Sequence, residues 1–373
     1  MKLKFGVLLL LLLTSQYASA TGFVLVHSKI AGNGDDALIL MEWIPLSPGG
    51  HCGVECCGDV QDDCCHYIAL YANGSGIYYV GYLYELWVTS NRNGVYLLHY
   101  FNEDKGVSVW RGYHGCFQQL GGVSSPYRLR VLLPYAAAMK NGHLDVYHIA
   151  CSIEKVGAIN ASPDCNFSLA PDSLTLHCKN GTRRFRLSPE GITEVEKLEW
   201  KPWPKVQRPS MVNGVVKNDE LVFSNGSKTY RIPLKDVLPY LQDPSEAEFL
   251  LGVFMENYLL ILPPTISYHR ESCNGTTKST LTFVAKNPYK THTIENVSSK
   301  DLKPVYGFIY NGELKAIPLL STDGYSFKPL AQKVIARDEC PCSGESRLSA
   351  SLSALIAAVL VSTVLLVILL RKR

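Results

Sequence analysis

Residues 77–84 read IYYVGYLY and residues 95–101 read VYLLHYF, and Asn93-Gly94 stands directly before the second run. Tyrosine, valine and phenylalanine are enriched in β-strands. Asn-Gly between apolar runs is the strongest short-range signal of a hairpin turn. These residues therefore predict strands joined by tight turns.

The same combination recurs along the chain. Short β-rich runs occupy residues 144–150, 221–223, 230–234, 279–285 and 305–310. Asn-Gly occurs at 33, 73, 93, 141, 180, 213, 225, 274 and 311, and Asp-Gly at 323. This spacing of strands and turns predicts an all-β protein built as a β-sandwich.

Helical signals are weak. Residues 135–140 and 245–250 each predict at most a turn or two of helix. The most apolar stretch of the body, residues 249–262, predicts one or two buried strands, because Gly252 and the Pro263-Pro264 stop oppose a helix.

Composition and charge exclude two other classes. The chain of 373 residues is 47% hydrophobic and 10% aromatic, which is too apolar for a disordered protein. Its formal net charge is +3, but five of the 36 basic residues lie at the extreme ends, and the other 31 face 33 acidic residues. A slightly acidic body does not predict a nucleic-acid-binding protein.

The N-terminus predicts entry into the secretory pathway. Residues 1–20 combine Lys2 and Lys4, an apolar run and the small residues Ala18-Ser19-Ala20, which is the pattern of a cleaved signal peptide. The apolar run is too short to span a bilayer. We expect the mature chain to begin at Thr21.

The C-terminus predicts a membrane anchor. Residues 348–370 carry no charge and are long enough to span a bilayer, and residues 371–373 (RKR) would form a short cytoplasmic tail. A GPI signal with Ser343 or Gly344 as acceptor is the alternative. The prediction is a type I membrane protein with an extracellular or lumenal ectodomain, in the secretory pathway and at the cell or virion membrane.

The cysteines agree with an oxidising compartment, where an even number predicts up to six disulfides. Five of the twelve crowd into residues 51–66, so at least one of these must pair outside the cluster, with Cys116 or Cys151 as candidates. The histidines and aspartates of the same segment leave a zinc site open as the alternative. The twelve are Cys52, Cys56, Cys57, Cys64, Cys65, Cys116, Cys151, Cys165, Cys178, Cys273, Cys340 and Cys342.

Seven N-x-Ser/Thr sequons predict a glycosylated surface. They are spread over most of the ectodomain, which favours a shielded globule, and we expect each of these segments to be exposed. Their asparagines are Asn73, Asn160, Asn166, Asn180, Asn225, Asn274 and Asn296.

The proline-rich segment 200–209, WKPWPKVQRP, predicts a linker between two β domains. The first domain would cover residues 21–199 and hold nine cysteines, and the second residues 210–338. A short stalk at 339–347 would lead to the membrane. One sandwich of more than 300 residues is the alternative.

Motifs for catalysis are missing. The sequence has no H-E-x-x-H, no G-x-S-x-G and no phosphate-binding glycine loop. His99, His114, His143 and His148 are interpreted as structural or surface residues. The turn at 33–36, Asn-Gly-Asp-Asp, could bind a cation, but turn chemistry explains it equally well. We predict no catalytic residue, no metal and no cofactor.

Three stretches resemble the amino-terminal domain of coronavirus spike glycoproteins. One is Asp164-Cys165 with Leu176-His177-Cys178, followed by Phe185, Leu187 and Gly191-Ile192, which resembles the disulfide-closed end of that domain. Another is residues 78–83 with Leu97, Leu98 and Asn102-Glu103, and the third is residues 305–310 with Leu319-Leu320 and residues 323–325 (DGY). In the family the strand pair runs almost directly into the disulfide, whereas about sixty residues intervene here.

The resemblance implies a virus-encoded accessory glycoprotein with a galectin-like β-sandwich that binds a host glycan or surface protein. The chain lacks the heptad repeats and fusion peptide of a fusion protein. A disulfide between Cys165 and Cys178 is likewise implied by the resemblance.

These features predict a type I membrane glycoprotein whose ectodomain binds a host-surface glycan or protein. The protein would contact membrane lipid through its C-terminal helix, and we expect no nucleic-acid partner. A structural subunit of an envelope or receptor complex, joined through an intermolecular disulfide, is the alternative, and an ecto-enzyme is a third reading. The candidate binding residues are the tyrosines of two hairpins, Tyr78, Tyr79, Tyr82, Tyr84 and Tyr96.

Overall fold

The computed structural model describes residues 19–46, 66–83, 85–101, 105–198, 209–273, 276–286, 288–324, 327–337 and 340. Within these residues the chain forms 28 strands that pair antiparallel into six sheets, with a few short helical turns. The all-β prediction is confirmed. We number the sheets as layers 1 to 6, in the order in which they stack.

The first three layers are four-stranded, and each is built from strands consecutive in sequence. Layer 1 contains β13 (Asn166–Ala170), β14 (Ser173–Cys178), β15 (Gly181–Ser188) and β16 (Gly191–Val195). Layer 2 contains β12 (Ile153–Asn160), β11 (His143–Ile149), β10 (Tyr135–Lys140) and β9 (Leu129–Leu132). Layer 3 contains β5 (Leu86–Asn91), β6 (Gly94–Phe101), β7 (Gly106–Tyr113) and β8 (Cys116–Ser124).

The other layers combine strands from distant parts of the chain. Layer 4 runs β25 (Tyr289–Glu295), β24 (Thr276–Lys286), β23 (Thr265–Cys273), β1 (Ser19–Asn33), β2 (Asp36–Leu46), β3 (His66–Asn73) and β4 (Gly76–Leu83). Layer 5 runs β17 (Ser210–Asn213), β21 (Leu251–Phe254), β22 (Leu259–Leu262), β26 (Val305–Tyr310), β27 (Leu314–Thr322) and β28 (Phe327–Pro329). Layer 6 runs β18 (Val215–Lys217), β19 (Glu220–Ser224) and β20 (Thr229–Pro233).

The short helical turns are α3 (Leu234–Val237), η1 (Leu238–Tyr240), η2 (Pro244–Phe249) and η3 (Ser299–Asp301). The turn predicted near 245–250 is therefore present as η2. The turn predicted over residues 135–140 is wrong, because this segment is β10.

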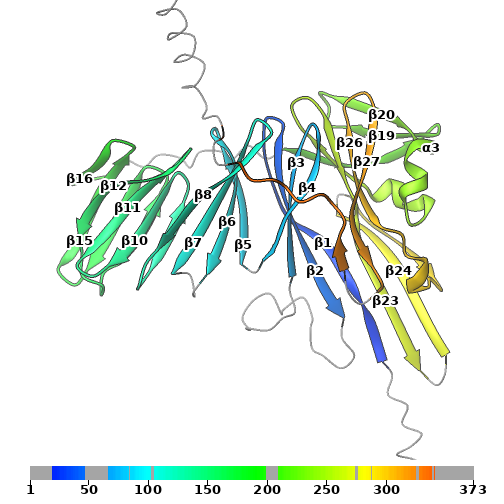
Figure 1. Ribbon diagram of the computed structural model, residues 1–373, viewed down its shortest axis with the longest axis horizontal. Coiled ribbons are helices and arrows are strands. Elements are labelled where there is room, and N and C mark those ends of the chain that lie inside the picture. The colour runs from blue at the N-terminus through cyan, green and yellow to red at the C-terminus, as the bar shows by residue number, and fades with distance from the viewer. Residues whose placement is uncertain are drawn as a thin grey trace, which may run out of the picture.

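The layers stand side by side in a row (Figure 1). Each of five hydrophobic clusters draws its buried side chains from two successive layers, so that every neighbouring pair of layers shares one core. Layer 1, with β15 and β16, ends the row on one side, and layer 6, with β19, β20 and α3, ends it on the other. The predicted sandwich of two sheets is replaced by a longer stack.

Alternating side chains explain how an inner layer fills two cores. In β10, Ala136 and Ala138 pack toward layer 3, while Tyr135, Ala137 and Met139 pack toward layer 1. Small and large side chains on opposite faces keep both cores filled. Burial on both faces makes the strand continuously apolar, and this is why its local pattern resembles a helix.

The predicted boundary at 200–209 does not divide the sheets into two independent sets. Strand β1 pairs with β23, for example Phe23 with Tyr268 and Leu25 with Ile266. Layer 4 thus joins the beginning of the chain to residues 265–295 of the predicted second domain. A local sequence pattern cannot reveal such a pairing, because the residues of a strand do not specify which distant strand it will pair with.

Two disulfides are resolved within the described residues. Cys165 bonds to Cys178, closing the β13–β14 hairpin, as the resemblance implies. Cys116, at the start of β8, bonds to Cys340. This bond excludes Cys116 as the partner of the cysteine cluster at residues 51–66, which was one of the two candidates from the sequence. Cys151 is also disulfide-bonded.

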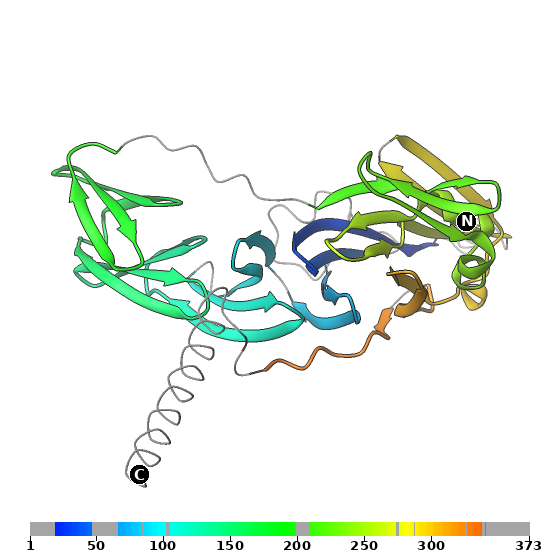
Figure 2. The ribbon, with the colours of Figure 1, turned by 90° about the horizontal axis from the view of Figure 1, so that it is seen from above.

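The C-terminal segment, residues 330–337, crosses from layer 4 to layer 3. The main chain of Tyr79 in β4 donates to the Gln332 carbonyl at 2.8 Å and accepts from the Val334 N–H at 2.8 Å. The Arg337 N–H donates to the Phe117 carbonyl at 2.7 Å. Figure 2 shows this segment in orange, running along the stack toward layer 3.

Several predicted features lie outside the described residues. These are most of the signal peptide, the cysteines Cys52, Cys56, Cys57, Cys64, Cys65 and Cys342, nearly all of the linker, and the segment 348–370. The predicted cleavage site after Ala20 falls inside β1. No helix in the described part of the chain is long and apolar enough to cross a bilayer.

Candidate functional site

The turn at residues 33–36 is held by hydrogen bonds from three other segments of the chain. The Asp36 carboxylate is 2% exposed and accepts hydrogen bonds from the Tyr71 hydroxyl and, at 2.9 Å, from the Gly115 N–H. Burial raises its pKa, partly offset by the hydrogen bonds. Asp35 accepts from the Asn257 N–H at 2.8 Å. Both carboxylates therefore anchor the turn to neighbouring segments, and this structural role favours the turn interpretation over the cation site.

A buried arginine lies in layer 3, near Asp36. Arg111 is fully buried, donates from Nε to the Asn93 carbonyl at 2.7 Å, and stands 4.7 Å from the Tyr113 ring centroid. Desolvation lowers the pKa of this guanidinium, while the neighbouring Tyr96 and Asp36 oppose the shift. The arginine and the hydrogen-bonded carboxylate together place a polar network in the interior of the stack.

The candidate binding tyrosines are largely internal. Tyr96 is fully buried and donates its hydroxyl to the Ala150 carbonyl at 2.9 Å, and burial raises its pKa to about 12. Because it is buried, Tyr96 cannot contact a ligand at the surface, and its assignment as a binding residue is corrected.

The tyrosines of β4 are partly covered. Tyr78 is half-buried, and its ring stacks on Tyr71 with centroids 6.5 Å apart. Tyr79 is half-buried and packs into the core between layers 4 and 5, while the C-terminal segment pairs with its backbone. Tyr84 and the side chain of Tyr82 lie outside the described residues. The predicted hairpin surface is thus mostly packing surface.

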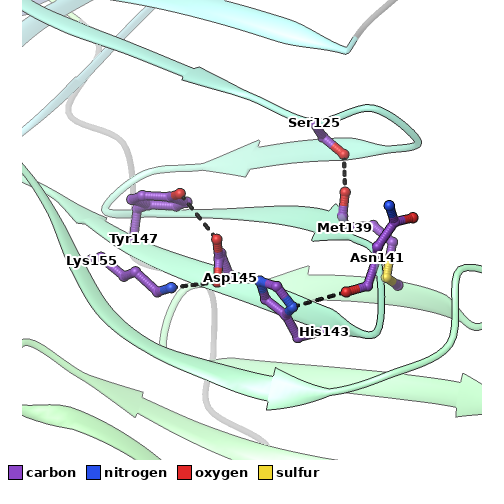
Figure 3. Close-up of polar contacts among 7 residues, drawn as sticks. All are labelled: Ser125, Met139, Asn141, His143, Asp145, Tyr147 and Lys155. Atoms are coloured by element: carbon purple, nitrogen blue, oxygen red, sulfur yellow. Dashed lines mark hydrogen bonds and ion pairs between the residues drawn. The ribbon is translucent and has the colours of Figure 1, made fainter.

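A charged cluster lies on β11 and β12 (Figure 3). The Asp145 carboxylate, 7% exposed, contacts Lys155 Nζ at 2.7 Å and His143 Nε2 at 3.3 Å. The Tyr147 hydroxyl donates to the same carboxylate at 3.4 Å. The hydrogen bond to Asp145 raises the pKa of Lys155. The cluster neutralises a buried carboxylate with an exposed ammonium group.

The same cluster lacks the geometry of a catalytic triad. Both ring nitrogens of His143 face oxygen acceptors, Nδ1 the Asn141 carbonyl at 3.1 Å and Nε2 the carboxylate. In a triad one ring nitrogen contacts the nucleophile and the other the carboxylate, whereas here Nδ1 contacts a main-chain carbonyl. The hydroxyl of Ser125, drawn in Figure 3, donates to the Met139 carbonyl and not to His143. The cluster is therefore interpreted as structural, as expected for His143.

An open groove lies at the other end of the stack. It has a volume of about 670 Å³ and runs between the helical turns after β20 and the β26–β27 turn. It is lined by Ile232, Pro233, Lys235, Asp236, Pro239, Tyr240, Tyr310, Gly312, Glu313 and Leu314. This is within the size range of ligand pockets.

Two tyrosines in the groove lining are held by aromatic neighbours. The ring of Tyr240 packs against Tyr306 at a centroid distance of 5.0 Å. The ring of Tyr310 meets Tyr230 edge-on at 5.9 Å, and its hydroxyl donates to the Arg231 carbonyl at 3.3 Å. These contacts fix both rings before any ligand arrives.

Three charged side chains line the groove: Lys235, Asp236 and Glu313, all exposed. Among the residues that the structure describes, none of the three has a side-chain hydrogen bond or ion pair. Their polar groups are thus available to a ligand. The sequence shows the Asn311-Gly312 turn and the prolines, but not that a turn near residue 312 meets residues 232–240.

The sequons differ in exposure. Asn160, Asn166, Asn180 and Asn296 are exposed, Asn225 is half-buried, and Asn274 lies outside the described residues. Asn73 is only 9% exposed, and its Oδ1 accepts hydrogen bonds from the Ser75 and Gly76 N–H groups. The expectation that every sequon is exposed is therefore wrong for Asn73, because its side chain closes the β3–β4 turn.

No group of three or more His, Cys, Asp or Glu side chains that could hold a metal occurs among the described residues. The alternative zinc segment, residues 51–66, lies outside them except for the backbone of His66.

The fold and the groove define a stacked antiparallel β protein with an open surface groove. No family model and no curated protein matches the chain. A structure described as a "putative 6-phosphogluconolactonase" from Bacteroides fragilis aligns with 87% of this chain and 97% of its own, at 8% identity and a TM-score of 0.23. AztD from Citrobacter koseri aligns with 74% of this chain and 94% of its own, at 11% identity and a TM-score of 0.19. Similarity at this level carries no functional argument.

Proposed function

We propose that the chain is a type I membrane glycoprotein whose ectodomain binds a cell-surface glycan or protein. The observation that carries this proposal is the groove at the end of the stack, whose exposed charged groups have no partner in the described part of the chain. The predicted signal peptide and membrane anchor, the sequons and the confirmed disulfides support a secretory location. The further proposal, that this is a viral accessory glycoprotein, rests on the resemblance to the spike domain alone.

The chemistry of the groove suits a ligand with both apolar and polar faces. The fixed rings of Tyr240 and Tyr310 offer flat apolar surface at a low cost in side-chain entropy. Asp236 and Glu313 accept hydrogen bonds from hydroxyl or amide groups, and Lys235 donates them. A sugar or a short peptide segment presents such faces.

The test uses the full-length chain, purified in detergent and screened on a glycan array and on cultured cells. We expect binding to at least one of them. Asp236→Asn with Glu313→Gln keeps the size of both side chains, and we expect it to weaken binding by about tenfold or more. Asp219→Asn with Glu295→Gln removes the same charge from exposed positions outside the groove, and it should leave binding unchanged.

Two outcomes would overturn the proposal. Absence of binding to any glycan or cell, together with tight self-association, would favour the structural subunit. Binding that survives the groove variant unchanged would assign recognition to another surface.

A further inference from the structure

The outer face of layer 1 is an exposed, cationic surface. Phe185 and Leu187 of β15 point into the core shared with layer 2, so the alternate residues Arg184 and Arg186 point outward. Arg184 lies opposite Thr175, and Arg186 opposite Ser173 and Thr193. The outward positions of the four strands hold Ser, Thr, Ala, Val, Gly, Asn166, His177 and the two arginines, and no carboxylate.

Neither outward arginine is neutralised by an ion pair among the described residues. Arg184 donates only to the main-chain carbonyl of Glu196, at 3.5 Å. Arg186 has no side-chain partner in the described part of the chain. By contrast, Arg183, one position away, points inward, where it forms an ion pair with Glu194 at 2.7 Å.

The layer at the opposite end of the stack differs from layer 1 because its outer face includes a carboxylate. A terminal layer needs a polar outer face for solubility. In layer 6 the two outward cations share one carboxylate: Arg231 forms an ion pair with Glu220 at 2.9 Å, and Lys217 lies opposite the same glutamate. The outward strand positions of layer 1 hold two arginines and no carboxylate.

We propose that the outer face of layer 1 binds a sulfated glycan chain. Arg184 and Arg186 stand two positions apart on one strand, about 7 Å, with both guanidinium groups on the same face. Guanidinium groups bind sulfate and phosphate oxygens through paired hydrogen bonds. The flanking hydroxyls of Thr175, Ser173 and Thr193 add neutral donors, so the face offers an extended strip to a linear polyanion.

This surface is separate from the groove, which lies in the last two layers at the other end of the row (Figure 1). The predicted glycan sites Asn166 and Asn180 lie at the end of layer 1 where Cys178 closes the hairpin. Arg186 lies toward the opposite end of the same strand. The sulfated chain would therefore bind over the part of the face that carries no sequon.

The test measures binding of the full-length chain in detergent to immobilised heparin, used as a sulfated probe, over a series of salt concentrations. We expect Arg184→Thr with Arg186→Thr to weaken binding by about tenfold or more and to flatten its dependence on salt. Threonine keeps the β-propensity of both positions. The matched control is Lys217→Thr with Lys328→Thr, which removes the same charge from exposed strand positions elsewhere and should bind like the wild type.

A second measurement needs no variant. Phenylglyoxal modification, read by mass spectrometry, should be reduced by heparin at Arg184 and Arg186 and unchanged at Arg231. Heparin binding that the arginine variant leaves intact, equal loss in the control variant, or equal modification with and without heparin would each overturn the proposal. Binding to desulfated heparin or to sialylated glycans alone would reject the sulfated class. Because none of these variants touches the groove, failure here leaves the groove assignment standing.

Discussion

Cys340 is disulfide-bonded to Cys116, 224 residues earlier in the chain, and so fixes the end of the C-terminal segment to the first residue of β8 in layer 3. The segment also pairs with Tyr79 of layer 4. The disulfide thus adds a covalent link to a connection between two layers that main-chain hydrogen bonds already make at Tyr79 and Phe117.

Removing this bond should cost more stability than removing the short-range one. Closing a longer loop restricts the unfolded chain more, so Cys116→Ser with Cys340→Ser should lower the free energy of unfolding by about 5 kcal/mol. Cys165→Ser with Cys178→Ser, separated by 13 residues, should lower it by about 3 kcal/mol. Urea unfolding of both variants checks the order, and a larger loss for the short loop would contradict it.

Local pattern predicts most strands because turns and alternation are local properties. The runs at 77–84, 95–101 and 305–310 become β4, β6 and β26 within a residue or two, and residues 249–262 become β21 and β22. The pairing of β1 with β23 and the stacking of six layers depend on contacts between distant segments, which no local signal encodes.

The candidate site residues also depend on contacts between distant segments, which the local sequence does not show. Tyrosine-rich hairpins indicate strands correctly, but a tyrosine in a strand can face a core as readily as solvent. Tyr96 lies in layer 3 between two neighbouring layers, so it is buried. The groove was missed because Tyr240 and Tyr310 lie in different elements 70 positions apart, and only the fold brings them together.

Tyr71→Phe should destabilise the fold. The substitution keeps the ring but removes the hydroxyl that donates to the buried Asp36 carboxylate. A buried acceptor that loses a donor costs about 1–3 kcal/mol. Thermal unfolding checks the loss against Tyr289→Phe, a tyrosine that is 77% exposed and should show no change. An equal effect of the two substitutions would show that the hydroxyl of Tyr71 does not support the network.

Glu246 should make stability fall as the pH rises from about 4.5 to about 7. Burial raises its pKa to about 7, from 4.5 in the unfolded chain. Between these values the unfolded chain releases a proton that the folded chain retains. The free energy of unfolding therefore falls by about 3 kcal/mol across this range, and the contribution of Glu246 is constant above it.

Glu246→Gln removes the titrating carboxyl group and keeps an oxygen that can accept the hydrogen bond from the Gln242 N–H. The variant should therefore be more stable than the wild type at pH 8 and about equal to it at pH 4. Urea unfolding at a series of pH values measures the difference, which cancels the other titrating groups. A difference that does not change with pH would show that folding does not raise the pKa of Glu246.

Asn73 should remain unmodified, whereas Asn180 should carry a glycan when the chain passes through the secretory pathway. Asn180 is exposed. Asn73 is 9% exposed, its Oδ1 accepts the Ser75 N–H at 2.9 Å, and its Nδ2 lies 3.6 Å from the place where a Cβ on Gly115 would stand. A sugar on that nitrogen would separate the β3–β4 turn from the β7–β8 turn.

Peptide mass spectrometry after enzymatic deglycosylation in heavy-oxygen water measures glycan occupancy at Asn73 and Asn180. Comparable occupancy would mean that the β3–β4 turn is not closed by the Asn73 side chain in the mature protein.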